Sequence, residues 1–126
     1  MKSLLAAVIF AASPALAIDV PSGQPVELQE VLVDEIGTET WLRFRFIAPE
    51  ITRDGGAVDY ETAAFDMSHL CDVLALSYID QYALSGDVIV ISLSDRATEF
   101  GTADPNATQF FEAYRPVDNV CIWEGL

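Results

Sequence analysis

The sequence predicts one α+β domain, in which a mainly antiparallel sheet carries one principal helix on one face, in the order β-β-α-β-β-β. Three observations support this fold class: a strictly alternating run at residues 40–49, a helical stripe at residues 60–76, and a continuous β-branched run at residues 88–91. With 126 residues in all, the chain has room for a single core. We therefore treat residues 26–126 as one domain.

Residues 1–17, MKSLLAAVIFAASPALA, predict a secretory signal peptide. Lys2 provides the positive charge, the apolar core is too short to span a bilayer, and Ala15 and Ala17 form a small-x-small cleavage site. The alternative is a buried N-terminal helix. Cleavage after Ala17 would leave 109 residues, and we expect a periplasmic or secreted product. No later apolar run reaches the ~20 residues of a membrane span, so we expect no stable membrane insertion.

The first two strands are expected to form a hairpin around Gly37, after an extended leader at residues 18–25 that contains two prolines and a Ser-Gly pair. Alternation in the second strand separates an apolar face from a polar face. The apolar face holds Leu42, Phe44 and Phe46, and the outward polar face holds Trp41, Arg43 and Arg45. Acceptors on the first strand are expected opposite the two arginines: Glu27, Gln29 and Glu30.

Asp59 is a suitable N-cap for a helix from Tyr60 to about Leu76. The apolar residues recur at spacings of three and four, which predicts one buried stripe. This stripe contains Ala63, Met67, Leu70, Cys71 and Leu74. Asp66 is expected elsewhere on the helix surface. The residues that follow, up to Gly86, continue irregularly and are compatible with a second short helix.

The β-branched run at residues 88–91 predicts a buried central strand. Its neighbours look like hairpins, so we do not expect the parallel sheet of a doubly wound enzyme. Residues 108–115 allow two interpretations, because Asp104 and Pro105 make a good helix start. A strand that returns through the PVDN turn into VCIWE is the favoured one.

Several stretches make the chain similar to a known family: ETWLRFRF, VDYETAAFDMSHLC, GDVIVISLSDRATEFG, DPNATQFFEAYR and CIWEGL. The chain resembles a domain-of-unknown-function family of small exported proteins from alphaproteobacteria, chiefly Rhodobacterales. The resemblance covers nearly all of the chain after residue 17 and implies a periplasmic or secreted bacterial protein with no assigned activity. Similar sequences sometimes carry the automatic label acetolactate synthase. The residues do not support that label, since no glycine-rich diphosphate loop or metal-binding motif accompanies it.

The net charge and the cysteine content limit the classes of binding partner and the cellular compartment that we expect for this protein. The net charge is −14, and loss of residues 1–17 removes one lysine and no acid, which makes it −15. This charge disfavours nucleic acid and is compatible with a cationic partner. Cys71 and Cys121 predict one disulfide in an exported chain, with two separate buried thiols as the alternative. They do not form a C-x-x-C motif, so a thioredoxin-like role lacks support.

The best local binding candidate is the polar strand face of Trp41, Arg43 and Arg45. An aromatic ring beside two guanidinium groups can bind an anion or a carboxylate through stacking and forked hydrogen bonds. The alternative is a strand face whose arginines pair with acids on the neighbouring strand.

A second candidate is the polar end of the strand at residues 86–94, with Asp95, Arg96 and Glu99. It supports an enzyme only if these side chains converge on a concave pocket. The single histidine, His69, would share a helix face with Asp66 and Asp72, but an ordinary surface helix explains this spacing as well. We predict no catalytic residues, no metal site and no cofactor.

Together these features favour a small, acidic, exported binding or accessory module without enzymatic activity, whose partner is a protein or a small ligand. A small enzyme that uses the end of the strand at residues 86–94 is the first alternative. A structural envelope protein that assembles with itself is the second.

Overall fold

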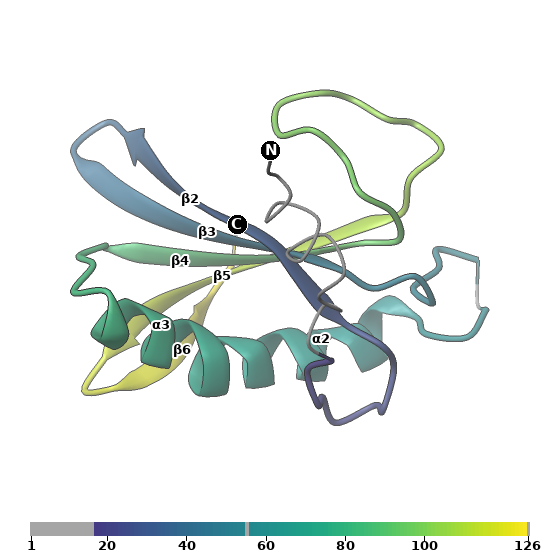
Figure 1. Cartoon of the computed structure of the whole chain (residues 1–126), viewed down its shortest axis with the longest axis horizontal. Helices are drawn as coiled ribbons and strands as arrows, with labels where there is room; N and C mark the ends of the chain where they lie inside the picture. The colour runs from purple at the N-terminus through teal and green to yellow at the C-terminus, as the bar shows by residue number, and fades with distance from the viewer. Residues whose placement is uncertain (1–16, 55, 126) are drawn as a thin grey trace, which may run out of the picture.

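A computed structural model describes residues 17–54 and 56–125 (Figure 1). The expected signal peptide, residues 1–17, therefore lies outside the described residues except for Ala17. Five strands form one sheet in the order β2-β3-β4-β5-β6, and a helical segment crosses one face of it. This arrangement confirms the α+β fold. None of the helices in the described ranges combines the length and the hydropathy of a membrane crossing.

The hairpin predicted around Gly37 joins β2 (Glu27–Ile36) to β3 (Glu39–Ile47). Gly37 has a φ of 61°, which favours glycine because it lacks a Cβ. Glu30 lies opposite Arg45 as expected, but Glu27 lies opposite Ile47. A bulge between Leu28 and Glu30 shifts the register, and Gln29, which lies at this bulge, is left without a partner in the pairing.

Strand β4 (Val88–Ser94) is the third of the five strands and is buried along its whole length, as its sequence predicts. The neighbouring runs are the expected hairpins, β2 with β3 and β5 with β6. Strand β4 pairs antiparallel with β5 but parallel with β3, a parallel pair that the sequence did not predict. The helical segment between β3 and β4 carries the chain across the sheet, and such a crossover produces a parallel pair. The sheet is therefore mixed, although three of its four pairings are antiparallel.

The helical segment consists of α2 (Tyr60–Leu70), a π-helical turn η1 (Cys71–Ala75) and α3 (Leu76–Gln81). Asp59 caps α2 as predicted, accepting a hydrogen bond from the Thr62 backbone N–H at 2.9 Å. This hydrogen bond lowers the pKa of Asp59 below its ordinary value. Four residues of the predicted stripe are buried, whereas Leu74 is only partly buried and Ala75 is fully buried. The wider π turn rotates the following residues and explains that change.

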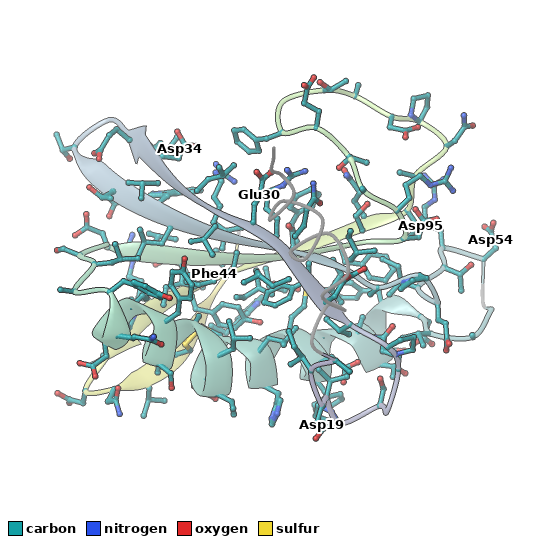
Figure 2. The ribbon with its side chains drawn as sticks, in the orientation of Figure 1. Asp19, Glu30, Asp34, Phe44, Asp54 and Asp95 are labelled. Atoms are coloured by element: carbon teal, nitrogen blue, oxygen red, sulfur yellow. A yellow bond between two sulfur atoms is a disulfide. The ribbon has the colours of Figure 1, made fainter. Side chains whose placement is uncertain are left out.

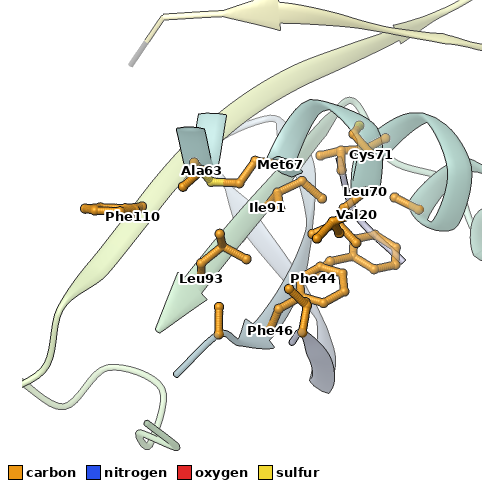
Figure 3. Close-up of a cluster of buried hydrophobic side chains, with 14 of the residues drawn as sticks. Val20, Phe44, Phe46, Ala63, Met67, Leu70, Cys71, Ile91, Leu93 and Phe110 are labelled. Carbon is orange, nitrogen blue, oxygen red and sulfur yellow. The ribbon is translucent and has the colours of Figure 1, made fainter. Parts of the chain in front are cut away.

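The core lies between the helical segment and the apolar face of the sheet (Figure 3). Met67 and Leu70 of α2 pack against this face, and Phe44 and Ile91 contribute to it from β3 and β4. Figure 2 shows Phe44 on the helix side and Glu30 on the opposite side. Alternation along the strands thus gives the sheet one apolar and one polar face.

Asp66 is fully buried, which corrects its expected place on the helix surface. Its Oδ1 accepts a hydrogen bond from the Ser22 backbone N–H at 2.9 Å. Its Oδ2 accepts from the Ser22 hydroxyl at 2.6 Å and from Gln24 Nε2 at 2.7 Å. Val20 and Val26 are buried in the same region. Residues 18–25 are therefore attached to the domain both by the hydrogen bonds of Asp66 and by the burial of Val20 in the core.

The C-terminal hairpin consists of β5 (Gln109–Val117) and β6 (Val120–Glu124), which confirms the strand interpretation of residues 108–115. The sulfur atoms of Cys71 and Cys121 lie 2.08 Å apart, as the predicted disulfide requires, and the Cα atoms are 6.2 Å apart. Asp72 Oδ1 also accepts a hydrogen bond from the Cys121 backbone N–H at 2.9 Å. Both contacts attach η1 to the edge strand β6.

Candidate functional site

The loop between β4 and β5 folds over the polar face of the sheet, opposite the helical segment (Figure 1). Its anchor is Thr98, which is buried. Arg45 Nη2 donates to the Thr98 carbonyl at 3.1 Å and to its hydroxyl oxygen at 3.0 Å. Gln29 Nε2 donates to the same carbonyl at 2.9 Å, and Gln109 Nε2 donates to the hydroxyl oxygen at 3.0 Å. Three strands therefore hold one loop residue.

Arg45 is buried, with 8% of its surface exposed, because this loop covers it. Its predicted position on an outward-facing surface is therefore corrected. The guanidinium group forms an ion pair with Glu30 and donates to Thr98. These partners compensate the loss of water around a buried charge. Arg45 thus attaches the loop between β4 and β5 to the sheet.

Arg43 is only partly buried and lies between two aromatic rings. Its guanidinium carbon is 5.4 Å from the ring centre of Trp41 and 5.3 Å from that of Phe100. Its Nε donates to Asp34 Oδ2 at 2.9 Å. Within residues 17–54 and 56–125, the two terminal nitrogens of Arg43 have no hydrogen-bond partner. The stacked guanidinium therefore keeps its outer donors available.

Arg43 and Arg45 line a pocket of about 110 Å³ that the loop forms with the sheet. The remaining residues of the lining that matter chemically are Ser92, Glu99, Phe100, Thr102 and Gln109. A cavity of roughly 10–15 Å³ holds one water molecule, so the pocket has room for a group of a few non-hydrogen atoms such as a carboxylate.

The predicted polar cluster at the end of β4 does not converge on this pocket. Arg96 donates from Nε and Nη2 to the two carboxylate oxygens of Asp95, at 2.9 and 3.1 Å. The hydrogen bond from Arg96 lowers the pKa of Asp95. Neither residue lines the pocket, whereas Glu99 does and accepts a hydrogen bond from the Thr102 hydroxyl at 3.1 Å. Asp95 and Arg96 therefore form a local turn pair.

The acids around His69 have other partners. Asp66 binds the N-terminal segment, and Asp72 binds the Cys121 backbone. Across the described ranges, no group of three His, Cys, Asp or Glu residues lies close enough to hold a metal ion. Ser92 lines the pocket on the polar face of the sheet while His69 lies on α2 on the other side, so the sheet separates the single histidine from this pocket.

Phe100, Thr98 and Gln109 form much of the pocket, but the sequence did not identify them as site residues. The fold places the long loop over β3, and no local pattern in the loop indicates that contact. The available signal is that polar Arg45 and Ser92 each stand between two apolar residues of their strand. They lie opposite each other on β3 and β4 and are both buried, and buried polar groups need partners.

Comparison with known proteins agrees with the resemblance noted from the sequence. No curated protein and no solved structure shows a significant match to the chain. A protein-family model matches residues 4–126, which is nearly the full length. The chain therefore belongs to the family of unknown function DUF6497.

Proposed function

We propose that this protein is an exported binding module without enzymatic activity, and that its arginine pocket takes a carboxylate group of a protein or small ligand. The observation that carries the proposal is Arg43, whose guanidinium is stacked between Trp41 and Phe100 while its outer nitrogens point to no partner among the described residues. A guanidinium presents a planar fork of N–H groups that matches a carboxylate.

The pocket also suits a carboxylate in size and in its lining. Its volume of about 110 Å³ is small, so it accommodates a terminal group and leaves the rest of the ligand outside. Gln109 and Thr102 add polar groups, and Phe100 and Phe111 add apolar walls. Glu99 also lines the pocket, where it accepts a hydrogen bond from the Thr102 hydroxyl, and its charge opposes an anion. A few polar groups on a partly apolar surface are typical of ligand sites.

The acidic character of the chain sets the expected strength of binding. Asp34 and Glu30 already pair with the two arginines, and the whole chain has a net charge of −14. Both features repel an anion, so recognition has to come from the direct contact with Arg43. We expect weak binding by a free carboxylate and tighter binding by a ligand that also contacts the aromatic rings.

Titration with N-acetylglycine, followed by NMR of the Trp41 indole N–H, tests the pocket. We expect saturable shifts, and Arg43→Gln should weaken binding at least about tenfold, because a hydrogen bond to a charged group contributes about 1.5–3 kcal/mol. Arg96→Gln is the matched control, since it removes the same charge from an exposed arginine outside the pocket. Equal weakening by both variants, or no saturable shift in the native protein, would refute the proposal.

Export is the second part of the proposal. It is supported by the signal-peptide pattern of residues 1–17 and by the paired cysteines, which are typical of oxidising compartments. Expression of the full chain in a Gram-negative host should yield a periplasmic product whose N-terminal residue is Ile18. Full-length protein retained in the cytoplasm would contradict export and would leave the pocket assignment to be judged by its own titration.

A further inference from the structure

A second concave site lies on the helix side of the sheet, between α2 and the hairpin of β5 and β6. It is a groove of about 370 Å³. Tyr60 and Phe65 of α2 border it on one side, and Trp123 of β6 borders it on the other. Phe65 is 73% exposed and Trp123 is 64% exposed, although both are large and aromatic. Glu112 and Tyr114 of β5 complete the groove.

Glu112 is an unusual residue at this position. It is 6% exposed, and the strand residues two positions before and after it, Phe110 and Tyr114, belong to the hydrophobic core. Its Oε1 accepts a hydrogen bond from Trp123 Nε1 at 2.6 Å. Of the five ion pairs among the described residues, none involves Glu112. Glu112 is therefore a nearly buried carboxylate among aromatic rings, and no cationic side chain of the described residues pairs with it.

These two features suit the same ligand chemistry. A buried carboxylate is stabilised by a positive group, and exposed aromatic faces attract cations within about 6 Å of the ring centre. The strongly acidic chain adds a long-range attraction for cations. The groove thus offers a charge at its base and rings along its sides.

We propose that this groove binds a cationic side chain, lysine or arginine, of a partner polypeptide. The charged end lies against Glu112, and the apolar stem lies between Phe65 and Trp123. A polypeptide source is favoured because the groove opens beside β6, an edge strand with no further strand on its outer side among the described residues, and a polypeptide can pair with such an edge. This site differs from the arginine pocket in its face of the sheet and in the charge it selects.

Tryptophan fluorescence provides the test, because the chain has two tryptophans and Trp41→Phe leaves Trp123 as the reporter. In this background, a capped Ala-Lys-Ala peptide should give a saturable change, and the matching norleucine peptide should bind at least about tenfold more weakly, since it lacks the charge. No saturable change with the lysine peptide, or equal binding of the norleucine peptide, would overturn the proposal. Butylammonium that binds as tightly as the peptide would overturn the polypeptide source.

Glu112→Gln is the decisive variant, because glutamine keeps an oxygen acceptor for the Trp123 indole N–H and removes the charge. We expect it to lose at least about tenfold in affinity for the lysine peptide. Glu35→Gln removes the same charge from an exposed residue of β2, the opposite edge strand, and should bind as the native protein does. Unchanged binding by Glu112→Gln would overturn the proposal.

Two more variants test the groove independently of Glu112→Gln. Phe65→Ala changes an exposed side chain and should preserve the fold while it weakens the lysine peptide severalfold; unchanged affinity would count against the groove. Arg43→Gln should leave lysine-peptide binding unchanged, so failure of the arginine pocket and failure of the groove are separate results.

Discussion

Replacement of both Cys71 and Cys121 by alanine should lower the free energy of unfolding by about 4 kcal/mol, because loss of the cross-link frees a long loop in the unfolded chain. The two cysteines are 50 positions apart in the sequence, and Cys71 is completely buried under the sheet. The bridge is also the covalent connection between η1 and β6.

Urea denaturation measures this effect. The native protein with reductant should unfold at the same urea concentration as the double variant without it, and both should unfold well below the oxidised native protein. A loss of less than about 1 kcal/mol in the double variant would show that the unfolded chain gains little freedom from opening the loop.

The disulfide also connects stability with the proposed cation groove. Cys121 lies on β6 two residues before Trp123, and Cys71 follows α2, which carries Phe65. One bridge therefore holds together the two elements that border the groove. Reduction is expected to affect cation binding more than binding at the arginine pocket, where β3, β4 and the covering loop provide the lining.

The local elements of this fold are predictable from the sequence, whereas their pairing is less so. The alternation around Phe44, the cap at Asp59 and the β-branched run of β4 each indicate an element by a local physical rule. The parallel pairing of β3 with β4 was missed, because it depends on how the helical segment crosses the sheet and not on any residue in either strand.

For the candidate sites too, residues within one strand are predictable from the sequence, whereas residues contributed by other elements are not. Trp41 and Arg43 are adjacent on one strand face, so alternation alone places them together. Phe100 reaches Arg43 only through the loop between β4 and β5, and Glu112 becomes significant only because α2 and β6 enclose it. Sequence patterns identify neighbours within an element, but they do not identify partners that the tertiary fold brings together.

Asp66 shows how a default assumption about charge can hide a structural residue. Charged side chains are rarely buried without partners, so an acid on a helix is assigned to solvent unless a partner is visible. Its partners, Ser22 and Gln24, lie more than 40 residues earlier, in a segment whose prolines and glycine suggest a simple leader. The carboxylate is instead the point at which this segment joins the helix.

Asp66→Ala should lower the free energy of unfolding by about 3 kcal/mol, since hydrogen bonds to a charged group contribute about 1.5–3 kcal/mol each and their energies are not additive. The variant leaves Gln24, which is 5% exposed, without an acceptor for its Nε2. It also removes the carboxylate that holds Ser22 beside buried Val20. Chemical denaturation measures the loss, and hydrogen exchange should show increased opening at residues 18–25.

Two controls separate this effect from a general loss of acidic charge. Glu61→Ala removes an exposed acid from the first turn of the same helix and should change stability by less than about 0.5 kcal/mol. Asp66→Asn keeps one oxygen acceptor and should be intermediate between the native protein and Asp66→Ala. If Asp66→Ala were as stable as Glu61→Ala, the hydrogen bonds of Asp66 to the N-terminal segment would contribute nothing to the stability of the fold. If Asp66→Asn were as stable as the native protein, hydrogen bonding and not charge would hold the segment in place.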